Sequence, residues 1–181
     1  MQEARGASLI GDPHDLGNSR RRLGLFFAVA GLGLALDQIT KWWAEGALTD
    51  RPPVPVIGTF LQFYLTHNPG AAFSSGVRFT WVFTIIAIVA TVVVIRYAGR
   101  SRNLAWTLAL GILLGGITGN LADRLARPPG IFRGHVVDFL MLPHWPVFNV
   151  ADMLIDTAAA IIVVLAWRGI RLDGSRDRDD E

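Results

Sequence analysis

The sequence predicts a mainly α-helical, polytopic membrane protein with four transmembrane helices and a small extracytoplasmic β-sheet. Of its 181 residues, 51% are hydrophobic and only 18% are charged, and the mean hydropathy is +0.39. The apolar residues gather in four long segments, and all six Trp lie near segment ends, as in the aromatic belts of membrane proteins. We expect residues 1–181 to form a single membrane domain, because the chain is short for several domains.

The four segments have the length that a bilayer requires. A spanning helix needs about 20 mostly apolar residues, since each residue adds 1.5 Å along an axis that crosses about 30 Å of hydrocarbon. The predicted spans are residues 23–43, 79–97, 104–121 and 147–167. A cleaved signal peptide is an alternative for the first segment, because Arg20–Arg22 precede an apolar run and Ala44-Glu45-Gly46 has a small-x-small pattern.

The basic residues predict the orientation of these spans. Of the 17 Lys and Arg residues, eleven flank the side that holds both termini and the loop near Gly99, and six flank the other side. Both termini are therefore expected to be cytoplasmic. The pI of 9.7 could suggest a nucleic-acid partner. The basic residues, however, flank the apolar segments and do not line up as one basic surface, so they predict a membrane protein with no nucleic-acid partner. The absence of Cys excludes a disulfide framework and a thiolate zinc site.

Two loops, residues 46–78 and 122–146, remain on the outer side. Residues 59–66 are rich in aromatic and branched side chains, which favour a small sheet at the membrane surface. Residues 135–139 in the second loop are short and strand-like. The polar tails, residues 1–19 and 173–181, are expected to be mobile.

Helix arithmetic places four carboxyl groups at one depth of the membrane. Asp37 and Asp123 lie near the outer ends of the first and third spans, and Asp152 lies about 8 Å into the fourth. Asp138 belongs to the loop that leads into the fourth span. An ionisable side chain costs about 2.5–3.5 kcal/mol at the bilayer centre and less near the interface, so each acid needs a partner or a chemical role.

Structural partners are available in sequence for two of these acids. The i,i+4 spacing of Asp37 and Lys41 favours an ion pair that supports the fold. Asp123 adjoins Arg124 and shares a helical face with Asn120, so it either braces a site or contacts a ligand.

The other two acids, Asp138 and Asp152, have no cation within one helical turn, which favours a chemical role. Two carboxyl groups that meet in a poorly solvated pocket share one proton near neutral pH. Such a pair can activate a water molecule and protonate a scissile carbonyl without forming a covalent enzyme adduct. Asp156, one turn deeper than Asp152, receives no role from the sequence.

Five motifs, in this order, resemble those of lipoprotein signal peptidase, also called signal peptidase II. The resemblance covers about residues 23–167. The motifs are Asp37-Gln-Ile-Thr-Lys41, Asn68-Pro-Gly-Ala-Ala-Phe73, Gly115-Gly-Ile-Thr-Gly-Asn120-Leu-Ala-Asp123-Arg124, Val136-Val-Asp138-Phe139 and Phe148-Asn149-Val-Ala-Asp152.

The resemblance implies an aspartic endopeptidase of the bacterial cytoplasmic membrane that removes signal peptides from diacylglyceryl-modified prolipoproteins. It implies that Asp138 and Asp152 form the catalytic dyad near the outer leaflet, beneath a small sheet and a mobile loop or short helix. It further implies inhibition by globomycin-type cyclic peptides, contact with membrane lipid, and no cofactor or metal. Nothing in the sequence requires more than a monomer. The substrate-binding residues that it implies are Asn68, Gly70, Asn120, Asp123, Arg124 and Asn149.

Other functions compete with this interpretation. Lys41 could activate Ser74 or Ser75 in a serine peptidase. His135, Asp138 and His144 could bind a metal, although their spacing is not that of helical ligands. A small proton-coupled transporter could use the same Asp cluster as a relay, but its acids should then be spread through the membrane depth. A non-enzymatic scaffold would leave the clustered Asn and Asp unexplained.

Overall fold

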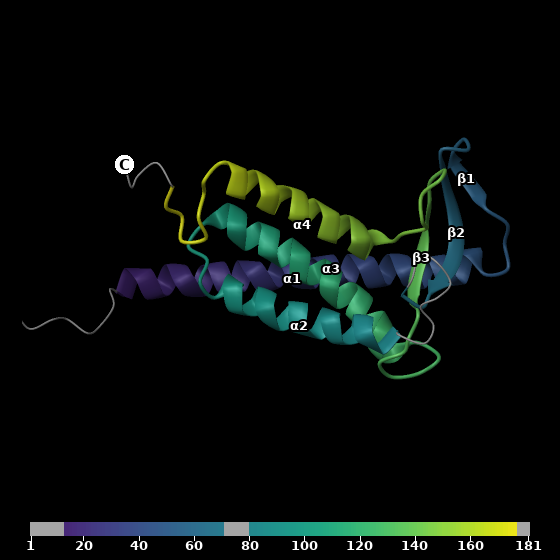
Figure 1. Ribbon diagram of the computed structural model, residues 1–181, viewed down its shortest axis with the longest axis horizontal. Helices are drawn as coiled ribbons and strands as arrows, with labels where there is room; N and C mark the ends of the chain where they lie inside the picture. Colours follow the sequence, from purple (N-terminus) through teal and green to yellow (C-terminus); the bar gives the residue numbers. More distant parts are fainter. Residues whose placement is uncertain (1–12, 71–79, 177–181) are drawn as a thin grey trace, which may run out of the picture.

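A computed structural model describes residues 13–70 and 80–176 of the chain. Within these residues, four helices run side by side in a bundle, and three strands form a sheet across one end of it (Figure 1). The elements in chain order are α1 (Pro13–Leu48), β1 (Val54–Ile57), β2 (Leu61–Asn68), α2 (Thr80–Ala98), α3 (Leu104–Ala126), β3 (Val136–Met141) and α4 (Val150–Trp167).

All four helices are long and apolar enough to cross a membrane, and the predicted fold class is confirmed. The observed bounds differ from the predicted segments. Residues 13–19, which we expected in a mobile tail, form the first turns of α1, and α3 continues past residue 121 to Ala126. The remaining tail residues, 1–12 and 177–181, lie outside the described part of the chain.

Helix α3 is the centre of the bundle, because it contacts each of the other three helices. Glycines allow its close approach to α1 and α4. A Cβ atom on Gly115 would lie 3.0 Å from the Ala30 carbonyl oxygen, and one on Gly116 would lie 2.6 Å from that of Ala151. At these glycines the backbone of α3 therefore lies in close contact with the backbones of α1 and α4, as small residues permit in membrane bundles.

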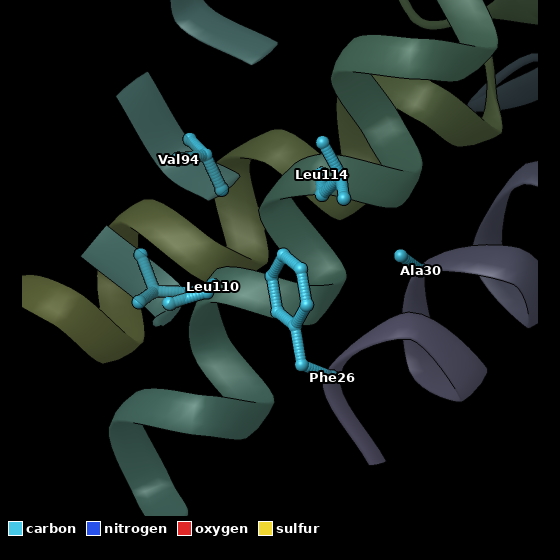
Figure 2. Packing of buried hydrophobic residues seen from close by; sticks show 6 residues of the cluster. Phe26, Ala30, Val94, Leu110 and Leu114 are labelled. Carbon is cyan, nitrogen blue, oxygen red and sulfur yellow. The ribbon is translucent and has the colours of Figure 1, made fainter. Parts of the chain in front are cut away.

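The apolar core lies in the half of the bundle that is distant from the sheet. Figure 2 shows Phe26 and Ala30 of α1, Val94 of α2, and Leu110 and Leu114 of α3 packed together, and each is at most 6% exposed. These residues hold three helices in contact by close packing alone.

The sheet closes the opposite end of the bundle. Its strands pair antiparallel in the order β1-β2-β3, and Thr66 of β2 pairs with Asp138 of β3. Trp43, near the end of α1, packs edge-on against Phe63 and Phe139, with ring centroids 5.1 and 6.2 Å away. These contacts fix β2 and β3 above the helix ends and so position Asp138.

Candidate active site

Asp138 lies in the middle of β3, and only 2% of its surface is exposed. Its Oδ2 accepts a hydrogen bond of 2.9 Å from Asn68 Nδ2, and its Oδ1 accepts one of 2.5 Å from Asn149 Nδ2. Burial raises the pKa of the Asp138 carboxyl to about 6, the charge of Asp152 adds to this increase, and the two Asn donors oppose it. Asp138 is therefore a buried acid whose proton is lost close to neutral pH.

Asp152 lies in the first turn of α4. Its Oδ1 accepts a hydrogen bond of 2.8 Å from Asn120 Nδ2, and its Oδ2 accepts one of 3.1 Å from the backbone N–H of Asn149. In return, the backbone N–H of Asp152 donates to Asn149 Oδ1 at 3.0 Å, which completes a capping box. The positive end of the helix dipole favours a negative charge at this position. Both predicted catalytic acids thus contact the one residue Asn149.

The orientation of each neighbouring amide is fixed by a second contact. Asn68 Oδ1 accepts from the backbone N–H of Gly70 at 2.8 Å, so its Nδ2 faces Asp138. Asn120 Oδ1 accepts from Lys41 Nζ at 2.9 Å and from Asn149 Nδ2 at 3.2 Å, so its Nδ2 faces Asp152. Each Asn therefore presents an N–H donor to a carboxyl group.

An ion network lies behind these amides. Lys41 is fully buried, and its Nζ lies 2.9 Å from Asp37 Oδ2 and 2.8 Å from Asp123 Oδ2. The i,i+4 pair of Asp37 and Lys41 is therefore present, with Asp123 as a second acid. Asp37 Oδ1 accepts from the backbone N–H of Ala151 at 2.9 Å, and Asp123 Oδ2 accepts from that of Val137 at 3.2 Å. The network thus binds the backbone of the residue that precedes each predicted catalytic acid in the sequence.

Three polar residues that the sequence interpretation did not assign also belong to this network. Gln38 Nε2 donates to Asp37 Oδ2 at 3.0 Å. Arg127 Nε donates to Asp123 Oδ1 at 2.7 Å, and its Nη1 contacts Glu45. Arg127 follows Asp123 at i,i+4, the spacing that predicted the pair of Asp37 with Lys41, so the same rule could have found it.

Arg124 is not paired with Asp123, although the two are adjacent in sequence. Its guanidinium lies over the ring of Phe83, 5.6 Å from the centroid. Its buried Nη1 has no hydrogen-bond partner within the described part of the chain. Gly70 meets the same ring, since a Cβ atom there would lie 2.6 Å from Phe83 Cδ2, and its φ of +112° favours glycine. A buried donor without a partner in the described residues therefore lies beside the Phe83 ring.

The remaining predicted residues fall into two groups. Asp156 is exposed and forms no hydrogen bond or ion pair with any described residue. Ser74 and Ser75 of the serine-peptidase alternative, and the part of the predicted covering loop at 71–79, lie outside the described residues. Among residues 13–70 and 80–176, no three His, Asp or Glu side chains gather as a metal site would require.

The comparisons with known proteins decide the family. The model of the family described as signal peptidase (SPase) II matches residues 29–168, a range that contains every acid and amide named in this subsection. The chain belongs to the signal peptidase II family. The family that the five motifs resemble is thereby confirmed.

Relatives and solved structures agree with this family. The chain is 43% identical to a lipoprotein signal peptidase of Streptomyces coelicolor over 88% of this chain and 78% of that protein. It is 45% identical to that of Rhodococcus jostii over 87% and 79%. A solved bacterial membrane enzyme matches with a TM-score of 0.70 and 25% identity over 80% of this chain and 88% of its own. A second such structure matches with a TM-score of 0.69 and 26% identity over 79% and 92%.

Proposed function

We propose that the protein is an aspartic endopeptidase that cleaves the signal peptide from diacylglyceryl-modified prolipoproteins, on the N-terminal side of the lipidated Cys. The observation that carries the proposal is the convergence of Asp138 and Asp152 on Asn149 from two separate segments of a signal peptidase II chain. Family membership supports the substrate class, and the two acids supply the chemistry.

The surroundings of the two acids assign their roles. Asp138 is the more buried acid and has a pKa raised to about 6, so it holds the shared proton and donates it to the scissile carbonyl oxygen. Asp152 lies at the positive end of α4 and accepts two N–H donors, so it is the ionised base that takes a proton from the attacking water. The tetrahedral intermediate then collapses. Asp152 passes the proton that it took from water to the departing amide nitrogen, and Asp138 regains its proton as the carbonyl group forms again.

The neighbouring polar residues hold either the substrate or the two acids in this mechanism. Arg124 Nη1 is buried without a partner in the described residues, and it can donate to a backbone carbonyl of an extended peptide. Asn68, Asn120 and Asn149 keep the two acids in place, and the small Gly70 leaves room beside Phe83. Correct placement of the scissile bond contributes much of the rate enhancement of a peptidase.

The proposal also includes a location. The excess of Arg in the segments that flank both termini supports an orientation with both termini in the cytoplasm of a bacterial cell and the two acids near the outer leaflet of the cytoplasmic membrane. A lipid-modified substrate then reaches the acids from the plane of the membrane. The protein would act as a monomer and would be inhibited by globomycin-type cyclic peptides.

Processing of a lipid-modified prolipoprotein tests the proposal. Wild type, Asp138→Asn and Asp152→Asn are expressed in a strain that lacks this activity, and precursor and mature forms are separated on a gel. We expect wild type to yield the mature form and each variant to leave the precursor uncut while still inserting in the membrane. Asp50→Asn, an exposed position outside the site, is the matched control and should process normally. Processing by either dyad variant near the wild-type rate would refute the dyad.

The transporter alternative receives no support from the depth of the acids. A proton relay requires ionisable groups at successive depths, whereas Asp37, Asp123, Asp138 and Asp152 belong to one connected set of hydrogen bonds. Globomycin separates the two functions, because it should block processing by the peptidase and leave proton flux through a carrier unchanged.

A further inference from the structure

The side chain of Arg127 joins the buried ion network to the outer part of the protein. Arg127 caps the C-terminal end of α3, and its side chain is 18% exposed. Its Nε donates to Asp123 Oδ1 at 2.7 Å, and its Nη1 contacts Glu45 in the last turn of α1. The planar guanidinium can bind two carboxylates at once because its N–H donors point in fixed directions. One side chain therefore ties the end of α3 to the end of α1.

The backbone around Arg127 is also fixed. Its N–H donates to the Asp123 carbonyl oxygen at 2.9 Å. The following loop returns to the end of α3 at Gly134, whose N–H donates to the Arg124 carbonyl oxygen at 3.1 Å. A Cβ atom on Gly134 would lie 2.9 Å from the Arg127 carbonyl oxygen and closer still to that of Asp123, so only glycine permits this approach. The guanidinium therefore reaches both carboxylates from a fixed base.

The contacts of Asp123 continue from Arg127 to β3. Asp123 Oδ2 lies 2.8 Å from Lys41 Nζ and accepts from the backbone N–H of Val137 at 3.2 Å. Val137 is fully buried and directly precedes Asp138. Without Arg127, Asp123 Oδ1 would lose the shorter of its two hydrogen bonds. The carboxylate would then be free to turn toward Lys41, and its bond to Val137 would weaken.

Glu45 holds Arg127 on the side that faces away from Asp123. The Glu45 side chain is 32% exposed, and its Oε1 lies 3.8 Å from Nε2 of His67 in β2. A cavity of about 300 Å³ borders Glu45, His67 and Arg127, so water has access to this side of the pair. Partly exposed ion pairs contribute little to stability. The pair of Glu45 and Arg127 is therefore better explained by the orientation it gives to the guanidinium.

We infer that Arg127 is a positioning residue, which fixes Val137 through Asp123 and thereby orients the carboxyl group of the next residue in β3. The inference rests on the proposed peptidase function. Within the described residues, Arg127 forms no hydrogen bond or ion pair with Asp138 or Asp152. Its removal should therefore slow the chemical step and leave substrate binding unchanged.

The kinetics of Arg127→Gln test the inference. The full-length protein in detergent cleaves a diacylglyceryl-modified prolipoprotein peptide, and kcat and KM are measured across the pH range. We expect kcat to fall by about tenfold to a hundredfold, the usual effect of a small misplacement of a reacting group, with KM unchanged. The decline of kcat/KM at high pH should move upward, because a displaced Asp138 loses part of the Asn donation that lowers its pKa.

Three further variants separate positioning from a general loss of structure. Arg127→Lys keeps a charge for Asp123 but lacks the fork that also reaches Glu45, so it should restore part of kcat. Glu45→Gln leaves every fully buried ion paired and should lower kcat less than Arg127→Gln, in the same direction. The double variant should be no slower than Arg127→Gln alone, because Glu45 acts through Arg127.

Arg133→Gln is the matched control, since Arg133 is an exposed arginine of the same loop, and it should keep the wild-type kcat and pH profile. Wild-type kcat and pH profile in Arg127→Gln, or an effect on KM alone, would overturn the inference. Wild-type kinetics in Glu45→Gln would overturn the part assigned to Glu45. Failure of wild type to cleave the peptide would instead refute the proposed function, so the two failures are distinguishable.

Discussion

The two halves of the helix bundle are held together by different interactions. In the half distant from the sheet, the side chains of Phe26, Leu110 and Leu114 pack with other apolar side chains (Figure 2). In the half beneath the sheet, Lys41 and Asp123 are equally buried, and the contacts between helices are ion pairs and amide hydrogen bonds. Close packing tolerates small shifts, whereas each buried ion depends on a particular partner.

This difference indicates which half contributes most to the free energy of unfolding and which half fixes the positions of the two acids. Lipid tails are as apolar as Leu, so the packed half gains mainly from shape complementarity. Buried ions gain little over well-packed apolar residues, but the removal of one partner is strongly unfavourable. The polar half therefore adds little to the stability of the bundle, but it fixes the positions of Asp138 and Asp152.

Lys41→Met should have the largest effect, because it leaves Asp37 and Asp123 buried without their shared cation. We expect a loss of about 3–5 kcal/mol in the free energy of unfolding, together with loss of prolipoprotein processing. Thermal unfolding in detergent and the gel assay measure the two effects. A variant with the melting temperature and processing rate of wild type would show that the network does not hold the site.

Leu114→Ala should have a smaller effect and should affect stability alone. Leu114 is 4% exposed within the packed half, so the substitution opens a cavity between α1, α2 and α3. We expect a loss of about 2 kcal/mol, at the low end for such changes, because the hydrophobic contribution is weak in lipid. Activity per folded molecule should stay at the wild-type value, and a change in the pH profile of this variant would contradict the separation of the two halves.

The pH dependence of cleavage should show the smallest effect and should arise only in the polar half. Asp138 has a pKa of about 6, and as the proposed acid it must be protonated, so kcat/KM should fall as the pH rises through about 6. Asn68→Ala removes a donor that favours the charged form, so the decline should move upward by about one pH unit.

The control for this profile is Asp50→Asn, which should leave the decline where it is in wild type. The measurement to compare is the pH at which kcat/KM declines, and it can be compared even if the total activity of the Asn68→Ala variant is low. A decline that moves to lower pH would reverse the proposed role of Asp138 as the acid.

Short-range rules of sequence were sufficient for much of the fold. Hydropathy located the four helices, and the i,i+4 rule identified the pair of Asp37 with Lys41. The helix ends were less accurate, because the predicted start at residue 147 did not include the capping role of Asn149. An Asn cap followed at the third position by an acid is a readable signal for a helix start at Val150.

Long-range pairing was not readable from a single sequence. The pairing of Thr66 with Asp138 joins segments from two different loops, and no local pattern specifies that register. The bonds from Lys41 to Asp123 and to Asn120 likewise depend on how α1 packs against α3. The motifs indicated that these residues belong to one site, but only the packing of the bundle shows which atom meets which.

Asn149 has a consequence for how the protein becomes competent during membrane insertion. The same side chain starts α4, through its bond to the backbone of Asp152, and holds Asp138 of the strand. The start of the last helix and the assembly of the acid pair consequently depend on the same side chain. A chain whose fourth helix has not yet docked contains both carboxyl groups but cannot align them, so the proposed activity should require the complete bundle.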